Sequence, residues 1–268
     1  MSPSFRGFNL YSSLRMFVGF DMKRQVVLTV SESKRLIAMG VAAMPEVSGA
    51  MEEGMVVVAT GTTNAYVLEE LWGRKIDKRR YRSGITTPKP PEKHPEPQEE
   101  GIPDVVFRKG EVASELDRYN AVEEMGQGDV YIKGANALDY LGGKVGVLIG
   151  SPTGGTVGAV LGNVIGKKIH LVIPIGLEKL VYGDIDDLHW LAAQEDSGGP
   201  SLWPLAGTII TEIEALQLLT GVDAHLYSAG GIAGAEGAVR LLLDGSDEEV
   251  KAALELVGSI KGEPRYLL

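Results

Sequence analysis

Three segments of the chain combine glycine with hydroxyl or amide side chains, a combination that suits the binding of an anion. The first, residues 61–64 (GTTN), lies between the apolar run 55–60 (MVVVAT) and a helical pattern. Glycine lets the backbone approach a ligand closely, and the first turn of a helix presents unpaired N–H groups with a partial positive charge. We expect this segment to bind a phosphate or a carboxylate; the alternative is a helix start with nothing bound.

The second and third segments also follow apolar runs. Residues 134–139 (GANALD) come after the run 129–133, and residues 150–156 (GSPTGGT) come after the run 145–149. The second offers an amide and a carboxyl group for sugar hydroxyls or proton transfer, and the alternative is an Asx-type turn that caps a helix. The third can form a nest of N–H groups around an anion. It lacks the Gly-Lys-Ser/Thr ending of a P-loop, and the chain lacks the GxGxxG pattern of dinucleotide folds.

These segments define the candidate site residues. Those expected to contact the ligand are Gly61, Thr62, Thr63, Asn64, Gly134, Asn136, Ser151, Thr153, Gly154, Gly155 and Thr156. An enzyme that moves a proton between adjacent carbons needs a carboxylate near the site that anchors the anionic ligand. For an enzyme we therefore expect Asp139 as the base and Lys133 as its electrostatic partner. A fourth glycine-rich segment, 230–234, is interpreted equally well as a close turn.

Charge and composition narrow the function classes. The net charge of −10 opposes nucleic-acid binding, and the absence of cysteine excludes disulfides and thiolate metal sites. The acidic cluster 184–189 is expected to be an exposed loop, so neither a metal nor a cofactor is predicted. The sequence has no uninterrupted apolar window of 18 residues, so a membrane span is not expected. We expect a cytoplasmic protein with a small anionic ligand, and assembly into a homo-oligomer stays open.

Apolar runs that alternate with helical patterns predict an α/β fold: a Rossmann-like, mostly parallel sheet with helices on both faces. Strands are expected at 25–29, 55–60, 105–108, 129–133, 145–149, 169–173, 207–211 and 224–228. Helices are expected at 33–44, 45–54, 65–72, 113–124, 155–166, 212–219, 235–243 and from Ser246 onward. Ligands of such sheets bind at the carboxyl ends of the strands, where the three segments lie.

The expected organisation has three parts. Residues 1–21 are interpreted as an N-terminal extension, and residues 22–181 as the main α/β domain with a Pro-rich excursion at 84–103. Residues 182–268 continue this domain or form a small α/β lobe, beginning with an irregular acidic stretch at 183–204. The basic run 74–82 can steer an acidic ligand or pair with the acidic tract 184–196, and solvated surface is the simplest interpretation.

Residues 33–180 resemble the superfamily of ribose-5-phosphate isomerase, glucosamine-6-phosphate deaminase and the CoA transferases. The run 53–63 (EGMVVVATGTT) is similar to the isomerase pattern DGM-VVGLGTGSTV, and 129–139 (DVYIKGANALD) is similar to a strand ending in GADEVD. The resemblance implies that Thr62 and Thr63 touch a phosphate and that Asp139 keeps an acid of the motif. Asn136 stands where the isomerase has an acidic residue. Neither the isomerase Arg-Glu-Lys motif nor the transferase glutamate has a counterpart.

Two functions are therefore compatible with the sequence. One is an isomerase-like or CoA-transferase-like enzyme that acts on a phosphorylated or CoA-like small molecule, which the retained Asp139 favours. The other is a non-catalytic ligand-binding or regulatory protein of the same fold, which the missing glutamate favours.

Overall fold

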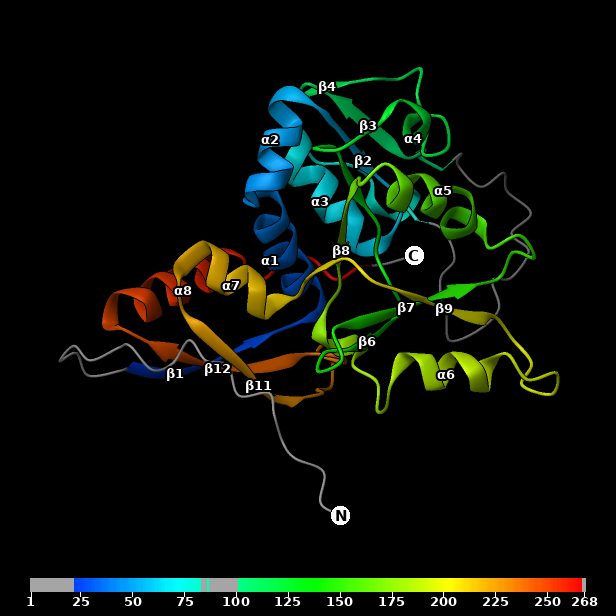
Figure 1. Ribbon diagram of the computed structural model, residues 1–268. Helices are drawn as coiled ribbons and strands as arrows, with labels where there is room; N and C mark the ends of the chain where they lie inside the picture. The colour runs from blue at the N-terminus through cyan, green and yellow to red at the C-terminus, as the bar shows by residue number, and fades with distance from the viewer. Residues whose placement is uncertain (1–21, 83–85, 87–100, 267–268) are drawn as a thin grey trace, which may run out of the picture.

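The computed structural model describes residues 22–82, 86 and 101–266, so the predicted extension 1–21 and most of the Pro-rich segment 84–103 lie outside the described residues. Within these ranges the chain has a mixed α/β fold with three sheets (Figure 1). None of the helices in this part of the chain is long and apolar enough to cross a lipid bilayer.

The central sheet has six strands in the order β10-β8-β5-β2-β3-β4. Four of them are parallel: β2 (Met55–Val58), β5 (Val130–Ile132), β8 (His170–Pro174) and β10 (Thr208–Ile210). The hairpin of β3 (Val105–Arg108) and β4 (Glu111–Val112) adds antiparallel strands beside β2. The sheet is therefore mixed, and the carboxyl ends of β2, β5 and β8 share one edge.

Helices cover both faces of this sheet. Val56 and Val58 of β2 belong to a core with residues of α1 (Val30–Ala42) and α3 (Thr62–Trp72). Val57, which points the other way, belongs to a second core with α4 (Ala121–Glu124) and α5 (Gly155–Gly166). Burial on both faces is the arrangement that a continuous run of valines predicts for an inner strand.

Local signals fix most helix ends. Thr29 and Glu32 form a capping box at α1, and Thr211 and Ser246 begin the capping boxes of α7 (Glu212–Thr220) and α8 (Asp247–Ser259). The helix α2 (Pro45–Glu53) begins at its proline and ends at Gly54. The expected helix at 113–124 is confirmed only for the short α4.

A second sheet joins the two ends of the described chain. Its antiparallel strands are β1 (Met22–Leu28), β12 (Val239–Gly245) and β11 (Asp223–Ala229), with β12 in the middle and α7 and α8 packed on one side (Figure 1). The predicted helix at 235–243 is wrong, because Val239, Leu241 and Leu243 alternate with more exposed residues and share the buried face of a strand. The expected domain boundary between residues 181 and 182 does not coincide with a division between sheets. The strand β1, before this boundary, belongs to the second sheet, and β10, after it, belongs to the central sheet.

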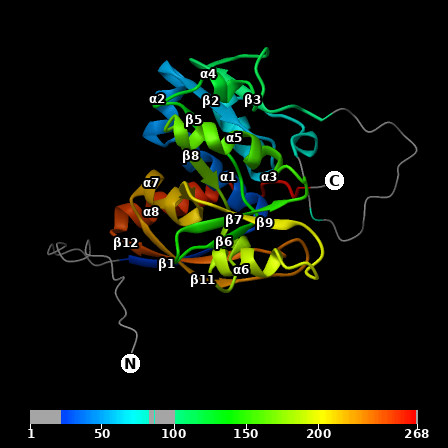
Figure 2. The same cartoon turned by 45° about the vertical axis from the view of Figure 1, so that its right-hand side comes forward.

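The third sheet is antiparallel and consists of β6 (Ala137–Asp139), β7 (Lys144–Ile149) and β9 (Ser201–Leu205) in that order. It lies between α6 (Ile185–Ala192) and the part of the molecule that contains the central sheet (Figure 2). The strand at 145–149 therefore forms as predicted, but outside the parallel sheet. The expectation of an irregular stretch at 183–204 is wrong, because α6 and β9 form there.

Candidate functional site

The three glycine-containing segments meet at a cavity of about 490 Å³. The predicted contact residues that line it are Gly61, Thr62, Thr63, Asn64, Gly134, Asn136, Ser151, Gly154, Gly155 and Thr156. Thr153 is not among the lining residues, and its hydroxyl lies 3.1 Å from that of Ser151. Lys133 also lines the cavity, whereas Asp139 does not.

The register of the sheets explains why these segments meet. Val58 of β2 pairs with Ile132 of β5, so the turns that follow these parallel strands leave the sheet at the same level. The third segment comes from the third sheet, which the turn at Asn136 holds in place. The backbone N–H of Asn136 donates to the carbonyl of Gly146 (2.8 Å), and its side-chain Oδ1 accepts from the N–H of Leu148 (3.1 Å). The cavity therefore lies between the central and the third sheet.

Two helices begin at the cavity without a side-chain cap. They are α3, after Gly61, and α5, after Gly154. Away from the cavity, α1, α6, α7 and α8 begin with a capping side chain, and α2 and α4 do not. The N–H of Gly61 donates to the carbonyl of Tyr81 (3.2 Å), and the first helical bond of α3 is made by Ala65. The first-turn N–H groups at 62–64 thus have no acceptor within the helix. Both helix dipoles add positive potential at the cavity.

Glycine is required where α5 begins. Gly154 and Gly155 have φ values of +82° and +55°, in the left-handed region that disfavours larger residues. A Cβ atom on Gly154 would also lie 2.7 Å from Cζ3 of Trp203. Successive glycines at a helix start form a concave backbone that suits an anion.

Two lysines supply the charge of the cavity. The Lys133 Nζ donates to the carbonyl of Gly134 (3.0 Å), and the Lys179 Nζ donates to the carbonyl of Ala135 (2.8 Å). Neither forms an ion pair within the described residues, and the cavity lining there contains no Asp or Glu. Burial, helped by the charges of Arg118 and Lys179, lowers the pKa of Lys133 to about 8. Burial also lowers the pKa of Lys179. The cavity therefore has a net positive character.

Arg118 connects the first and third segments. Its guanidinium donates to the hydroxyls of Thr156 (2.7 Å) and Thr60 (3.3 Å) and forms an ion pair with Asp104. Asp104 also accepts the N–H of Thr60 at 2.5 Å. Burial raises the pKa of Asp104 even though Arg118 and Thr60 favour its charged form. This cluster holds the two walls of the cavity in a fixed relation.

Asn64 contributes to the fold as well as to the cavity wall. Its amide Nδ2 donates to the carbonyls of Ala59 (2.7 Å) and Ile132 (3.3 Å), and so joins the ends of β2 and β5. Its Oδ1 and the hydroxyl of Thr63 are buried without a hydrogen-bond partner among the described residues.

Asp139 has a structural partner instead of a place at the cavity. It ends β6, opposite Lys144 of β7, and its carboxylate accepts the N–H of Gly142 (2.8 Å) in the turn between these strands. The structure therefore brings only Lys133 of the two predicted catalytic residues to the cavity.

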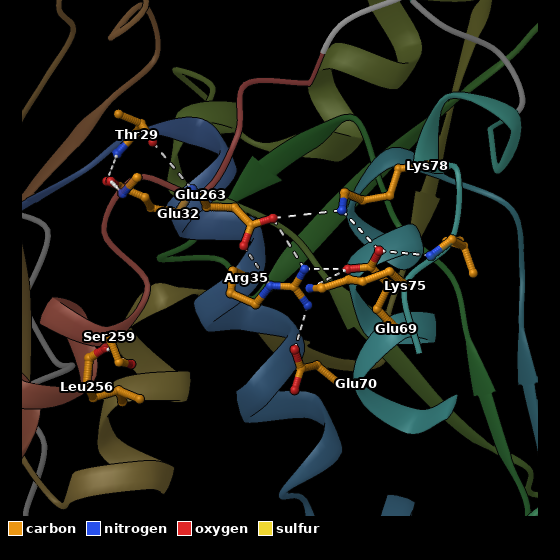
Figure 3. A network of polar contacts seen from close by, with 12 residues as sticks. Thr29, Glu32, Arg35, Glu69, Glu70, Lys75, Lys78, Leu256, Ser259 and Glu263 are labelled. Carbon is orange, nitrogen blue, oxygen red and sulfur yellow. Dashed lines mark hydrogen bonds and ion pairs between the residues drawn. The ribbon is translucent and has the colours of Figure 1, made fainter. Parts of the chain in front are cut away.

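The basic run 74–82 packs against the end of α3. Lys75 and Lys78 each lie 3.1 Å from the carboxylate of Glu69, which also pairs with the buried Arg35 of α1 (Figure 3). Arg35 in turn binds Glu263 of the C-terminal segment at 3.0 Å. Although burial opposes it, this surrounding charge lowers the pKa of Glu69 to about 2. These two lysines thus stabilise a junction of α1, α3 and the C-terminal segment.

The remaining candidates lie elsewhere. Asp184 caps α6, and Lys144 pairs with Asp184 (3.3 Å) and Asp186 (2.5 Å). The described residues contain no group of three side chains that could hold a metal ion. The segment 230–234 lies in the connection between β11 and β12 and does not line the cavity. A larger hollow, of about 680 Å³, lies at the opposite ends of the strands, beside His170 and Thr208, and contains none of the predicted residues.

Sequence reasoning missed Arg118 and Lys179. Lys179 follows the end of β8, the parallel neighbour of β5, so the order of the strands was the signal that could have found it. Arg118 has no comparable signal, because it belongs to the irregular chain before α4 and acts through two threonines.

Comparison with known proteins adds no identification. No protein-family model, no curated protein and no solved structure matches this chain.

Proposed function

We propose that this protein binds a small phosphorylated molecule in the cavity between the central and the third sheet. The observation that carries the proposal is electrostatic: two uncapped helix starts and the two lysines Lys133 and Lys179 converge on a cavity without an acidic residue in its described lining. Helix N-termini and backbone nests are common phosphate sites. An anion at this point would pair with two lysines that form no ion pair within the described residues.

The size and chemistry of the cavity favour a ligand such as a sugar phosphate. A volume of about 490 Å³ is within the range of small-molecule sites. The phosphate would lie at the start of α3, near Thr62 and Thr63, and the sugar hydroxyls near Asn136 and Ser151. This placement agrees with the resemblance to the sugar-phosphate isomerases and with a Rossmann-like arrangement, in which ligands lie at the carboxyl ends of the strands.

Binding is better supported than proton transfer by a carboxylate. Asp139, the expected base, is engaged in the turn after β6, and no other described acid lines the cavity. We therefore place the function with ligand binding, and any chemistry with the amines.

Isothermal titration calorimetry at pH 7 with ribitol 5-phosphate and with ribitol tests the proposal. We expect the phosphorylated polyol to bind and ribitol not to bind. Lys133→Met should weaken binding at least tenfold, whereas Lys251→Met, a change on the exposed side of α8, should leave it unchanged. Equal affinity for ribitol, or full affinity in Lys133→Met, would contradict the proposal.

The first turn of α3 permits a second, backbone-level test. Thr62 occupies the first helical position, where proline is tolerated, and the preceding Gly61 is already extended. Thr62→Pro removes both an N–H and a hydroxyl, whereas Thr62→Val removes only the hydroxyl. If the phosphate binds at the helix start, Thr62→Pro should lose more affinity for ribitol 5-phosphate than Thr62→Val does.

A further inference from the structure

Lys133 has the surroundings of a reactive amine. It directly follows the strand β5 and lines the cavity. Together with Tyr131, Val157 and Leu171 it also lines a small apolar hollow. Among the described residues, its ammonium group donates a hydrogen bond to the carbonyl of Gly134 and lies near two other cations, Arg118 and Lys179. A lysine that is desolvated and placed beside another cationic group is a typical nucleophile toward carbonyl carbons.

We propose that Lys133 forms an imine with an aldehyde or ketone group of the bound phosphorylated ligand, so that the cavity takes phosphorylated carbonyl compounds. The inference rests on the proposed phosphate site and adds the class of ligand and a covalent step. It does not need the carboxylate that the cavity lacks.

The step balances without a further reactant. The lone pair of the neutral Lys133 Nζ attacks the carbonyl carbon, and the C=O π electrons move to the oxygen. The two protons of the amine are transferred to that oxygen, which leaves as water when the C=N bond forms. One amine and one carbonyl thus give one imine and one water, with no oxidation or reduction.

The charges around each lysine distinguish Lys133 from Lys179. Lys179 lies near Glu178 and Glu212, whose charges favour its ammonium form. The acid near Lys133 is Asp104, which is already paired with Arg118. With a pKa of about 8, about half of the Lys133 amine is neutral at pH 8, against about 0.3% for an ordinary lysine. We assign the nucleophile to Lys133, which lines both the cavity and the apolar hollow, and we assign phosphate binding or polarisation of the carbonyl to Lys179, which lines the cavity alone.

Reductive trapping tests the proposal on the intact chain. The protein is incubated at pH 8 with erythrose 4-phosphate and cyanoborohydride, which reduces an imine to a stable secondary amine. Mass spectrometry then counts the additions and maps them to peptides. We expect one fast addition, on Lys133, at least tenfold faster than labelling of the exposed Lys251 in the same sample. Erythrose, which lacks the phosphate, should label Lys133 at least tenfold more slowly.

Two comparisons keep the result interpretable. The variant Lys133→Arg keeps a cation and should lose the fast addition. In the wild-type protein, excess ribitol 5-phosphate, which has no carbonyl group, should suppress the fast addition. Labelling of Lys133 no faster than Lys251, or a fast addition that persists in Lys133→Arg, would overturn the imine. If ribitol 5-phosphate binds but no imine is trapped, only this inference fails; if Lys133 is labelled equally by erythrose, the phosphate site of the proposed function fails.

Discussion

Replacing Lys133 with methionine should make the protein more stable at neutral pH, because the lysine is held charged where burial disfavours its charge. Burial and the nearby Arg118 and Lys179 lower its pKa from 10.5 to about 8. Methionine is unbranched and of similar length, and the apolar hollow around Lys133 can accept it. The variant removes the charge and leaves most of the packing.

The magnitude follows from proton linkage. Between pH 8 and 10.5 the unfolded chain binds more protons at this residue than the folded protein, so the wild-type free energy of unfolding rises with pH there. The full difference in pKa corresponds to about 3 kcal/mol. Lys133→Met should therefore be more stable by up to about 3 kcal/mol at pH 7, and this advantage should shrink to about 1 kcal/mol at pH 10. Lys34, whose pKa burial also lowers to about 8, titrates equally in both proteins and cancels from the difference.

Urea unfolding of the two proteins at several pH values between 7 and 10, followed by circular dichroism, measures this difference. Lys251→Met, on the exposed side of α8, is the matched control and should show no pH-dependent difference from the wild type. A difference between wild type and Lys133→Met that stays constant with pH would refute the reasoning, because Lys133 would then have an ordinary pKa.

Three further predictions concern other charged groups. Burial and the charge of Glu178 raise the pKa of Glu212 to about 7, so wild-type stability should fall between pH 4.5 and 7, and Glu212→Gln should remove this fall in urea unfolding. Arg35→Met leaves the buried Glu69 without its main partner and should cost about 3–5 kcal/mol by the same assay. When ribitol 5-phosphate binds at pH 8, the protein should take up protons, because the bound anion favours the ammonium form of Lys133. Calorimetry in two buffers of different ionisation enthalpy measures this proton uptake.

Each of these has a clear contrary result. An unchanged pH slope in Glu212→Gln would show that this carboxyl titrates normally. A loss below about 1 kcal/mol in Arg35→Met would show that the network in Figure 3 is as weak as a surface ion pair. Equal proton uptake by the wild type and Lys133→Met would assign the uptake to another group.

The sequence predicted the parts of the fold that depend on local signals. The valine run before Gly61 forms β2, and the helices expected at 212–219 and from Ser246 onward form as α7 and α8. The same rules placed the turns after β2 and β5 at one edge, because parallel neighbouring strands end together. Such reasoning succeeds when one segment of chain contains the whole signal.

Pairing between distant segments could not be read in this way. The strand β12 contains three consecutive leucines, which fit a helix as well as a strand until β1 and β11 are known to flank it. Likewise β7 has the composition of a parallel strand, and only its pairing with β6 and β9 places it in another sheet. The choice between the alternatives depends on contacts that the pattern of one segment does not contain.

The residues of the candidate site show the same contrast between local signals and contacts across the fold. The glycine and threonine residues were found because they follow strands, whereas Arg118 and Lys179 were missed because their roles depend on side-chain reach across the fold. Asp139 was chosen as a base on its position in a motif. Its carboxylate instead accepts a backbone N–H in a tight turn, a role that acidic residues commonly have.

A crystal structure with ribitol 5-phosphate bound tests the central claim most directly. We expect phosphate oxygens within hydrogen-bond distance of first-turn N–H groups of α3 or α5, with the Lys133 or Lys179 ammonium beside them. A phosphate bound elsewhere on the protein, with the cavity between the two sheets left empty at saturating ligand, would contradict it.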